Sequence, residues 1–289
     1  MCGRVNVSDH DGLRALLAMM GMQVWPVAPA SYNVAPSSTI DVVRQTDDKR
    51  RPTLNSSASN SAQCNNPEPN KLELKSMRWG FSGAGYGTGS QLLFNARSES
   101  VFSKPTFRAS ALNHRAIVPI NGFYEWQTTA EGPKRAFYIE RPESPAMALA
   151  AIFQPHIKDE KKSARQNTLQ AQQLSLGFSD NDKESQNVSS KPPLTNTSEI
   201  HHSCEHNVCV LTMAANQQMR GLHARMPVIF DPQQAIRWIH EGDEAMLSSC
   251  QREAEHNIFA IKQVINHVNN AANDGPECLA NWRDKKKID

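Results

Sequence analysis

The apolar residues of this chain occur in short segments bounded by turn-forming residues, and this pattern limits the fold more than any other feature. Short runs of apolar and aromatic residues favour strands over helices. None approaches the roughly 20 apolar residues that a membrane-spanning helix requires. We therefore predict many short strands and no membrane segment. The predicted strands are residues 40–43, 77–81, 92–96, 116–126, 136–140, 147–153, 208–212 and 258–264, and folded sequence also continues from 212 to 230.

Helical periodicity is confined to a few segments. From Ser8 to about Met20, leucines and methionines recur at helical spacing after a serine suited to the N-cap position. Asp231 and Pro232 form a second start signal, with proline at the first helical position, and a short helix follows from about Asp243. Many strands with few helices predict an α+β fold, with a bent sheet or small barrel flanked by helices.

Two long polar stretches interrupt the apolar segments. Residues from about 45 to 70 and from about 155 to 207 are rich in Ser, Asn, Gln or Pro and show no sustained period. Such sequence cannot bury enough apolar surface to offset the entropy lost on ordering. We predict a single domain over residues 2–270, interrupted by these two disordered insertions, and a C-terminal tail over residues 271–289.

Charge and cysteine content limit the functions open to the chain. Its 289 residues carry a formal net charge of +2, so a phosphate-binding surface must use a few placed arginines rather than bulk charge. No hydrophobic signal segment follows Met1, so we expect an intracellular protein with reduced thiols. The six cysteines are scattered without a C-x-x-C pair, which favours neither a disulfide framework nor a zinc motif.

Cys2 is the most reactive candidate. Initiator methionine is generally removed ahead of a small residue, and removal of Met1 leaves an α-amine and a thiol on one residue. An α-amine has a pKa of about 7.7–8.0 and a free thiol one of about 8.5, so both are partly nucleophilic at neutral pH. Such a pair condenses with an aldehyde, first to a Schiff base and then to a five-membered thiazolidine. Taken alone, Cys2 also fits a small core residue.

Polar residues also lie inside two apolar strands. Alternation along residues 94–99 puts Asn95, Arg97 and Glu99 on one face. Glu125 lies between aromatic residues, an environment that favours the protonated carboxyl group that a general acid needs near neutrality. The structural alternatives are an ordinary Arg97–Glu99 ion pair and a hydrogen-bonded strand carboxylate.

His223 and Arg225 form a third polar group. They are two residues apart and share one face if this segment is extended. A core histidine with one backbone partner is the structural alternative for His223.

Together these features resemble the SOS-response-associated peptidase family, whose members are abasic-site shields that crosslink to DNA through an N-terminal cysteine. The resemblance covers most of the chain outside the polar stretches. It implies a bifurcated, barrel-containing mixed β structure with surrounding helices and a basic cleft for single-stranded DNA. The matching motifs are Met1-Cys2-Gly3-Arg4, Asn33-Val34-Ala35-Pro36, Arg78-Trp79-Gly80, Asn95-Ala96-Arg97, Pro119 with residues 122–126, and His223-Ala224-Arg225-Met226-Pro227, while residues 264–270 and 276–279 resemble the eukaryotic branch.

The resemblance also implies catalytic roles. Cys2 would attack C1′ of the ring-opened sugar, amine first and thiol second. Asn95 would orient the Cys2 terminus, and Glu125 would move the protons of ring opening and imine formation. His223 would protonate the sugar oxygen or assist reversal. Neither a cofactor nor a metal is implied.

A DNA-binding surface follows from the same resemblance. Arg4, Arg97 and Arg225 would hold the phosphates that flank the lesion, because bidentate guanidinium geometry suits this anion. Trp79 and Phe81 would stack on exposed bases.

The chain departs from the family in one place. Residues 81–89 form a short, glycine-rich segment where the family has a proline and an aromatic residue. Because family members use this region as a wedge at DNA junctions, we do not carry that property over.

The function implied is a sensor of abasic sites in single-stranded DNA. It would form a covalent thiazolidine crosslink through Cys2 and shield the lesion during replication-associated repair. Such a protein is an enzyme with lyase-type Schiff-base chemistry, and the family name adds thiol autopeptidase activity. We expect a nuclear, monomeric protein whose partners are abasic-site DNA and the replication machinery, with no membrane partner.

Three other interpretations fit parts of the sequence. A thiol peptidase would use Cys2 as nucleophile and His223 as base, although with only Met1 ahead of Cys2 we expect little for it to remove. A non-catalytic reader of single-stranded or modified DNA would keep its binding without Cys2. Residues 201–206 with Cys209 hold enough soft ligands for zinc, but their spacing matches no closed site.

Overall fold

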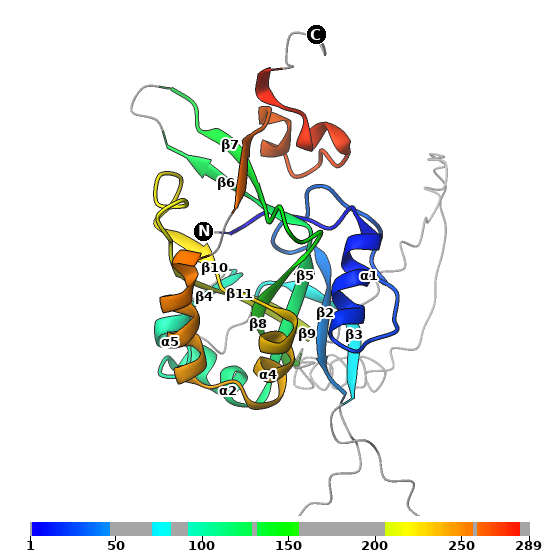
Figure 1. The fold of residues 1–289 in the computed structure, drawn as a ribbon, viewed down its shortest axis with the longest axis vertical. Helices are drawn as coiled ribbons and strands as arrows, with labels where there is room; N and C mark the ends of the chain where they lie inside the picture. The colour runs from blue at the N-terminus through cyan, green and yellow to red at the C-terminus, as the bar shows by residue number, and fades with distance from the viewer. Residues whose placement is uncertain are drawn as a thin grey trace, which may run out of the picture. The chain divides into compact units, whose positions relative to one another are not determined.

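The short apolar segments form two β-sheets in the computed structural model, with helices around them (Figure 1). The structure describes residues 2–46, 71–81, 92–128, 132–155, 206–256 and 259–283. The described residues belong to one compact unit, residues 1–155 with 204–289. The predicted α+β class is confirmed. Most of both predicted insertions lies outside the described residues.

The larger sheet contains β2 (Thr39–Gln45), β3 (Leu72–Trp79), β4 (Asn95–Arg97), β5 (Arg115–Ile120), β8 (Met147–Pro155), β9 (His206–Ala214), β10 (Arg225–Pro227) and β11 (Ile229–Phe230). Its order is β10-β9-β3-β2-β5-β8-β11, with β4 paired to β9. The sheet is mixed, because β3 and β4 run parallel to β9 whereas the other pairs are antiparallel. Strand β9 also pairs with β8, and this pairing closes the strands between them into a ring.

The smaller, 4-stranded sheet consists of β1 (Val5–Asn6), β6 (Gly122–Gln127), β7 (Arg135–Glu140) and β12 (Ala260–Gln263), paired in the order β1-β6-β7-β12. Strand β5 of the larger sheet leads directly into β6, with Asn121 between them. At Gly122 a β-carbon would lie 2.3 Å from the ring of Tyr138, so the close approach of β6 to β7 requires glycine. The strand predicted over residues 116–126 is therefore two strands, one in each sheet, and the β structure is bifurcated as predicted.

The helices of the described residues are α1 (His10–Met19), α2 (Pro105–Asn113), α4 (Pro232–Glu241) and α5 (Glu244–Glu253). Helix α1 lies where helical periodicity predicts it, but its N-cap is Asp9 and not Ser8. The Asp9 carboxylate accepts a hydrogen bond of 3.0 Å from the backbone N–H of Gly12. Helix α4 begins after the predicted cap, Asp231, and Gln234 completes a capping box.

Four short 3-10 helices are also present in this part of the chain: η2 (Ser98–Ser100), η3 (Ala254–His256), η4 (Asn266–Asn269) and η5 (Pro276–Leu279). Cys278 on η5 is fully buried in a cluster with Tyr124 and Tyr138 of the smaller sheet and Val268 of η4. The first part of the segment predicted as a C-terminal tail therefore packs against this sheet.

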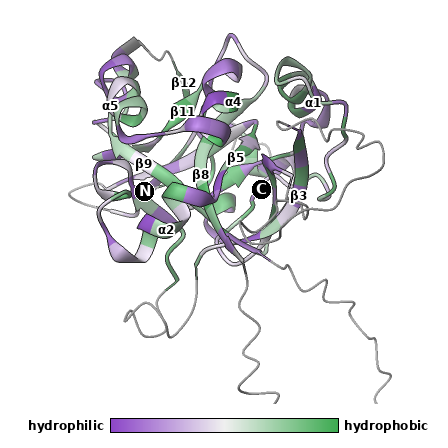
Figure 2. Cartoon of the chain, turned by 90° about the horizontal axis from the view of Figure 1, so that it is seen from below, coloured by the Kyte–Doolittle hydropathy of each residue, from purple (hydrophilic) through white to green (hydrophobic). Residues whose placement is uncertain are grey.

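A larger apolar core combines buried residues of the ring strands with buried residues of the helices. Figure 2 shows hydrophobic residues on β5 and β8, two strands of that ring. The leucine stripe of α1 (Leu13, Leu16 and Leu17) is buried in this core, as its spacing predicts. No helix in the described ranges is long and apolar enough to cross a membrane.

Candidate functional site

The N-terminal segment runs antiparallel to β6, and this pairing brings the first residues of the chain to the junction of the two sheets (Figure 1). Val5 pairs with Phe123, and the backbone N–H of Tyr124 donates to the carbonyl of Arg4 over 2.9 Å. Cys2 packs into the larger core. Arg4 instead lies close to Tyr124 and the second apolar cluster.

Cys2 is fully buried, and its environment favours the protonated thiol. Its carbonyl accepts a hydrogen bond of 2.8 Å from Nδ2 of Asn95 on β4. Burial raises the pKa of the Cys2 thiol far above its ordinary value, and the negative charge of Glu125 raises it further. The Oδ1 atom of Asn95 is itself buried and has no hydrogen-bond partner among the described residues. Asn95 thus holds the Cys2 carbonyl with its Nδ2 donor, while its Oδ1 atom remains able to accept a hydrogen bond.

Glu125 and His223 form the other half of the site. Glu125 lies on β6 and is only 3% exposed. The Nδ1 atom of His223 lies 3.6 Å from Oε1 of Glu125, and 32% of the histidine side chain is exposed. A buried carboxylate beside a titratable imidazole can hold or pass on a proton. The structure therefore gathers Cys2, Asn95, Glu125 and His223 around one point, and their catalytic roles remain predictions.

Arg225 is held by an acidic partner that the sequence pattern did not assign to it. Its Nη1 and Nη2 atoms donate to the two carboxylate oxygens of Glu99 over 2.6 and 2.8 Å, and Nη2 also donates to the carbonyl of Thr212. Strand β4 ends at Arg97, so Glu99 lies in η2 and does not continue the predicted alternation.

Arg225 also sets the charge state of Glu99. Partial burial alone would raise the pKa of Glu99. The hydrogen bonds and charge of Arg225, together with the charge of Arg97, outweigh burial and lower this pKa below its ordinary value.

The other two predicted phosphate ligands differ in exposure. Arg97 is exposed at the end of β4. Arg4 is partly buried: its Nη1 atom donates to Oδ1 of Asn33 over 2.8 Å and to the carbonyl of Val268 over 2.7 Å. Burial lowers the pKa of the Arg4 guanidinium from its ordinary value. Of Arg4, Arg97 and Arg225, Arg97 is the exposed one.

The prediction that Trp79 and Phe81 stack on DNA bases is wrong for this structure. Their side chains are 0% and 1% exposed. The indole N–H of Trp79 donates to the carbonyl of Phe94 over 3.0 Å, and the ring of Phe81 packs against Phe107. A ring without exposed surface cannot receive a base, so both residues belong to the core.

Asn33, noted in the sequence only as part of a motif, connects three segments of the chain. Its Nδ2 atom donates to the carbonyls of Val268, Asn270 and Asn273 over 3.3, 3.0 and 2.7 Å, while its Oδ1 atom accepts from Arg4. The side chain is almost fully buried. A polar residue three positions ahead of a proline, with two apolar residues between them, was the only local signal of this role.

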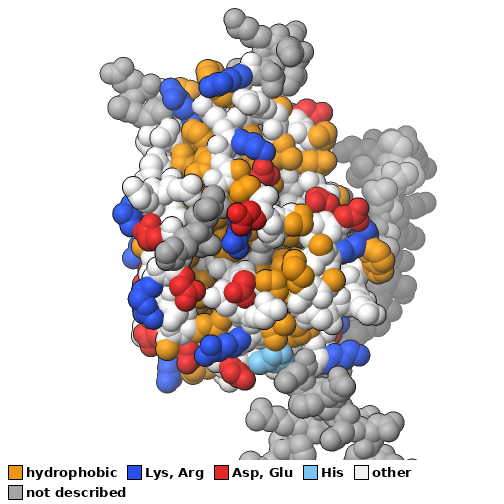
Figure 3. Space-filling model, viewed as in Figure 1, with side chains coloured by type: hydrophobic (Ala, Val, Ile, Leu, Met, Phe, Trp, Pro, Cys, Tyr) orange, Lys and Arg blue, Asp and Glu red, His pale blue; other side chains and the backbone are white. Residues whose placement is uncertain are grey.

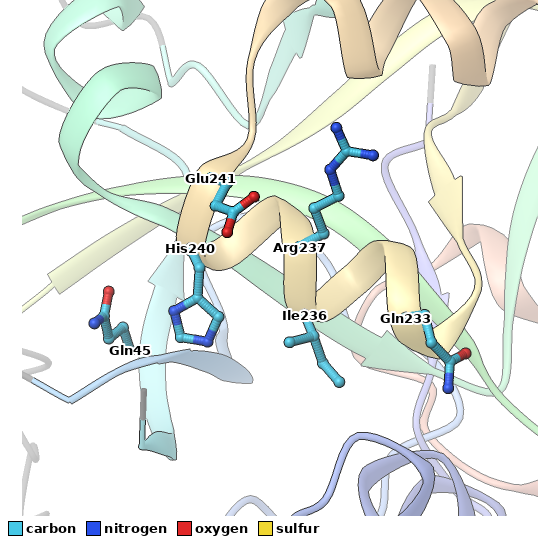
Figure 4. Close-up of a pocket in the computed structure, with 6 residues that line it drawn as sticks. All are labelled: Gln45, Gln233, Ile236, Arg237, His240 and Glu241. Carbon is cyan, nitrogen blue, oxygen red and sulfur yellow. The ribbon is translucent and has the colours of Figure 1, made fainter. Parts of the chain in front are cut away.

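One face of the molecule carries mixed charge, and one hollow beside α4 lies apart from the predicted site residues. On the face shown in Figure 3, basic and acidic side chains are interspersed. A hollow of about 470 Å³ lies beside α4 and the end of β2, and it contains none of the predicted site residues (Figure 4). It is lined by Gln45, Gln233, Ile236, Arg237, His240 and Glu241.

A zinc site gains no support from the described ranges. They hold no group of three or more His, Cys, Asp or Glu residues that could bind a metal ion. Residues 201–205 of the alternative zinc interpretation lie outside the described residues, and Cys209 is buried in β9.

The fold and the site define a class of mixed-β protein in which a cysteine at the start of the chain is built into a polar site at a sheet junction. The chain belongs to the SOS response associated peptidase (SRAP) family, whose model matches residues 1–271.

Two relatives are named as abasic site processing proteins. The chain is 26% identical over 225 residues to the abasic site processing protein HMCES of Xenopus tropicalis, which covers 75% of this chain and 53% of that protein. It is 24% identical over 258 residues to the abasic site processing protein YoqW of Bacillus subtilis. This match covers 86% of this chain and 85% of YoqW. The match thus spans about half the length of the Xenopus relative.

A solved structure shows the same fold. A crystal structure of a protein from Bacteroides thetaiotaomicron matches with a TM-score of 0.61 and 16% identity, over 96% of this chain and 99% of that chain.

Proposed function

We propose that this protein senses abasic sites in single-stranded DNA and forms a covalent crosslink with them through Cys2. The observation that carries the proposal is the placement of Cys2 against Asn95 and the Glu125–His223 pair. The names of the two relatives support DNA with abasic sites as the substrate. The thiazolidine product would shield the lesion during replication-associated repair.

The reaction needs an aldehyde and a free 1,2-aminothiol. A ring-opened abasic sugar carries the aldehyde at C1′, and removal of Met1 frees the α-amine of Cys2. The amine adds to C1′, and loss of one water gives a Schiff base. The thiol then adds to the same carbon, its proton passes to the nitrogen, and the five-membered ring closes. The balance requires no oxidant, reductant or cofactor.

The raised pKa of the Cys2 thiol supports this order of steps. A buried, protonated thiol is a poor nucleophile, so the amine reacts first. Once the imine has formed, the Glu125 carboxylate can accept the thiol proton and return it to the nitrogen. The same raised pKa speaks against a thiol peptidase, which needs a ready thiolate, and autopeptidase activity stays a prediction.

The neighbouring side chains suit the remaining steps. Glu125 is buried beside His223, so protons can move between the two groups as the sugar ring opens. His223 is partly exposed, which allows contact with the sugar oxygen. The unused Oδ1 acceptor of Asn95 can take a hydrogen bond from the freed amine and direct its lone pair to C1′.

DNA contact would begin at Arg97, the exposed arginine of the predicted set. The phosphate contacts predicted for Arg4 and Arg225 remain predictions, since their guanidinium groups already bind Asn33 and Glu99. Nuclear location, monomeric state and replication partners also remain predictions.

The test is a crosslinking assay. Protein whose first residue is Cys2 is incubated with single-stranded DNA that carries one abasic site, and the products are resolved under denaturing conditions after heating. We expect a heat-stable adduct with this DNA and none with the undamaged strand. A matched preparation that retains Met1 has its Cys2 amine in a peptide bond and should form none. Absence of an adduct with the processed protein would refute the proposal.

A further inference from the structure

We infer that Glu99 is a positioning residue of this site, which acts through Arg225 to fix the tautomer and orientation of the His223 imidazole beside Glu125. The consequence for crosslinking rests on the proposed function. The hydrogen bonds that define the positioning are independent of the proposed function.

The first link joins Glu99 to Arg225. Two parallel N–H···O bonds of 2.6 and 2.8 Å connect the carboxylate to the guanidinium, a bidentate geometry that fixes direction as well as distance. The carbonyl of Thr212 on β9 accepts from the same guanidinium, whose side chain is only 16% exposed. The Arg225 guanidinium is thereby fixed from η2 on one side and from β9 on the other, and its backbone lies in β10, opposite Ala214 of β9.

The second link joins the Arg225 backbone to His223. The backbone N–H of Arg225 donates to Nδ1 of His223 over 2.9 Å. A neutral imidazole carries one N–H, so acceptance at Nδ1 leaves the proton on Nε2. Two acceptors also face Nδ1 and favour a proton there: Oε1 of Glu125 at 3.6 Å and the carbonyl of Arg225 at 3.1 Å. The position of the Arg225 backbone therefore decides whether Nδ1 accepts a hydrogen bond, with the proton on Nε2, or carries the proton itself.

A different role for Glu99 is to hold Arg225 until a DNA phosphate replaces the carboxylate. The observed contacts favour positioning. Transfer of Arg225 to a phosphate would break both carboxylate bonds, and the guanidinium would also have to leave the Thr212 carbonyl. Loss of Glu99 separates the two roles, because positioning acts on the His223 imidazole whereas restraint of Arg225 acts on DNA affinity.

The direct test uses no DNA. Protein with ¹⁵N-labelled histidine is compared by NMR as wild type and as Glu99→Gln, with the His223 signals assigned by their absence in His223→Gln. We expect an acceptor Nδ1 and a protonated Nε2 in the wild type, and a mixture of tautomers in Glu99→Gln. Glu73→Gln is the matched control, because it breaks the Arg44–Glu73 pair (2.7 Å) on β2 and β3 with the same charge change. An unchanged His223 spectrum in Glu99→Gln would overturn the inference.

The functional test measures crosslinking rate and DNA affinity separately. We expect Glu99→Gln to slow adduct formation about tenfold, less than loss of a direct proton-transfer group, with affinity unchanged or slightly raised. Glu99→Asp should recover part of the rate. A gain in affinity with an unchanged rate in the bound complex would show that Glu99 restrains Arg225 from DNA, and the inference would fall. If wild type forms no adduct, the proposed function fails, while the NMR comparison still decides the inference.

Discussion

Cys2 and Arg4 are near neighbours in the sequence, yet the regions around them are built differently. Around Arg4, Asn33 binds three backbone carbonyls from residues 268–273, with hydrogen bonds of 2.7 to 3.3 Å. Around Cys2, the Glu125–His223 pair is 3.6 Å apart, and Asn95 keeps a buried acceptor without a partner among the described residues. The Arg4 region uses hydrogen bonds to join distant segments. The Cys2 region keeps proton carriers and an acceptor for a substrate.

The sharpest test of this contrast removes the thiol. Cys2→Ala should abolish the heat-stable adduct, because the thiazolidine needs the sulfur atom, and should leave at most an imine that borohydride can trap. The measurement is adduct yield on a denaturing gel after heating. A full yield of heat-stable adduct in this variant would exclude the thiazolidine.

Glu125→Gln should have the next largest effect. It removes the buried proton carrier while keeping a similar shape, so adduct formation should slow roughly 10²-fold, the low end for acid–base catalysis. DNA affinity should remain nearly intact, as measured by fluorescence anisotropy with an undamaged strand. Parallel losses of rate and affinity would make Glu125 a structural residue instead.

In the Arg4 region the expected effect is on stability. Asn33→Ala removes the hydrogen bonds to three carbonyls of residues 268–273 and the acceptor of Arg4, and it should lower the free energy of unfolding by about 2–3 kcal/mol. Chemical denaturation measures this loss. Asn113→Ala is the control, since Asn113 is exposed and binds one carbonyl of its own helix; it should cost less than about 0.5 kcal/mol. Below the unfolding transition, Asn33→Ala should crosslink at the wild-type rate; a selective loss of rate would place Asn33 in the site.

Arg97→Ala should alter DNA binding modestly and without regard to the lesion. Loss of one phosphate contact on a single strand reduces the slope of log affinity against log salt by about 0.7. Affinity should fall alike for intact and abasic strands, because phosphates carry no lesion information. The comparison is a salt titration on both strands in the Cys2→Ala background, with Arg14→Ala on α1 as a charge-matched control. An unchanged slope would remove Arg97 from the DNA surface.

The smallest effect concerns the pH dependence of stability at Glu99. Its pKa is lowered in the folded state, so it stabilises the fold above the unfolded-state value of about 4.3 and loses this contribution as pH falls through the folded value. Wild type should therefore be slightly more stable than Glu99→Gln at neutral pH and equal to it near pH 2. The difference is small because the Glu99 side chain is 47% exposed. Denaturation curves at both pH values measure it, and a difference that persists in acid would contradict the assignment.

Local sequence signals predicted much of the fold, whereas contacts between distant segments could not be predicted from them. The leucine stripe of α1 and the Asp231 cap of α4 are encoded within a few residues, so they could be found in the sequence, whereas the cap of α1 lies one residue after the predicted Ser8. The division of the strand over residues 116–126 could not, because it depends on the passage of Gly122 against Tyr138.

The same limit applies to the site. Periodicity alone did not bring Cys2, Asn95, Glu125 and His223 together; the family resemblance did. Glu99 and Arg225 are 126 positions apart, and neither residue's neighbours in sequence indicate the other. Trp79 and Phe81 were misassigned because an aromatic residue in a short strand has the same local pattern whether it faces DNA or the core.

The pairing that closes the ring of strands has a consequence for engineering. Pro155 on β8 and His206 on β9 are opposite one another in the ladder, so the two described positions that flank residues 156–205 lie side by side in the sheet. The entropic cost of closing a loop rises only about 0.6 kcal/mol for each doubling of its length. This position should therefore tolerate large changes of length, from a short turn to an inserted reporter domain. A fluorescent protein could be placed there while the N-terminus keeps its native sequence.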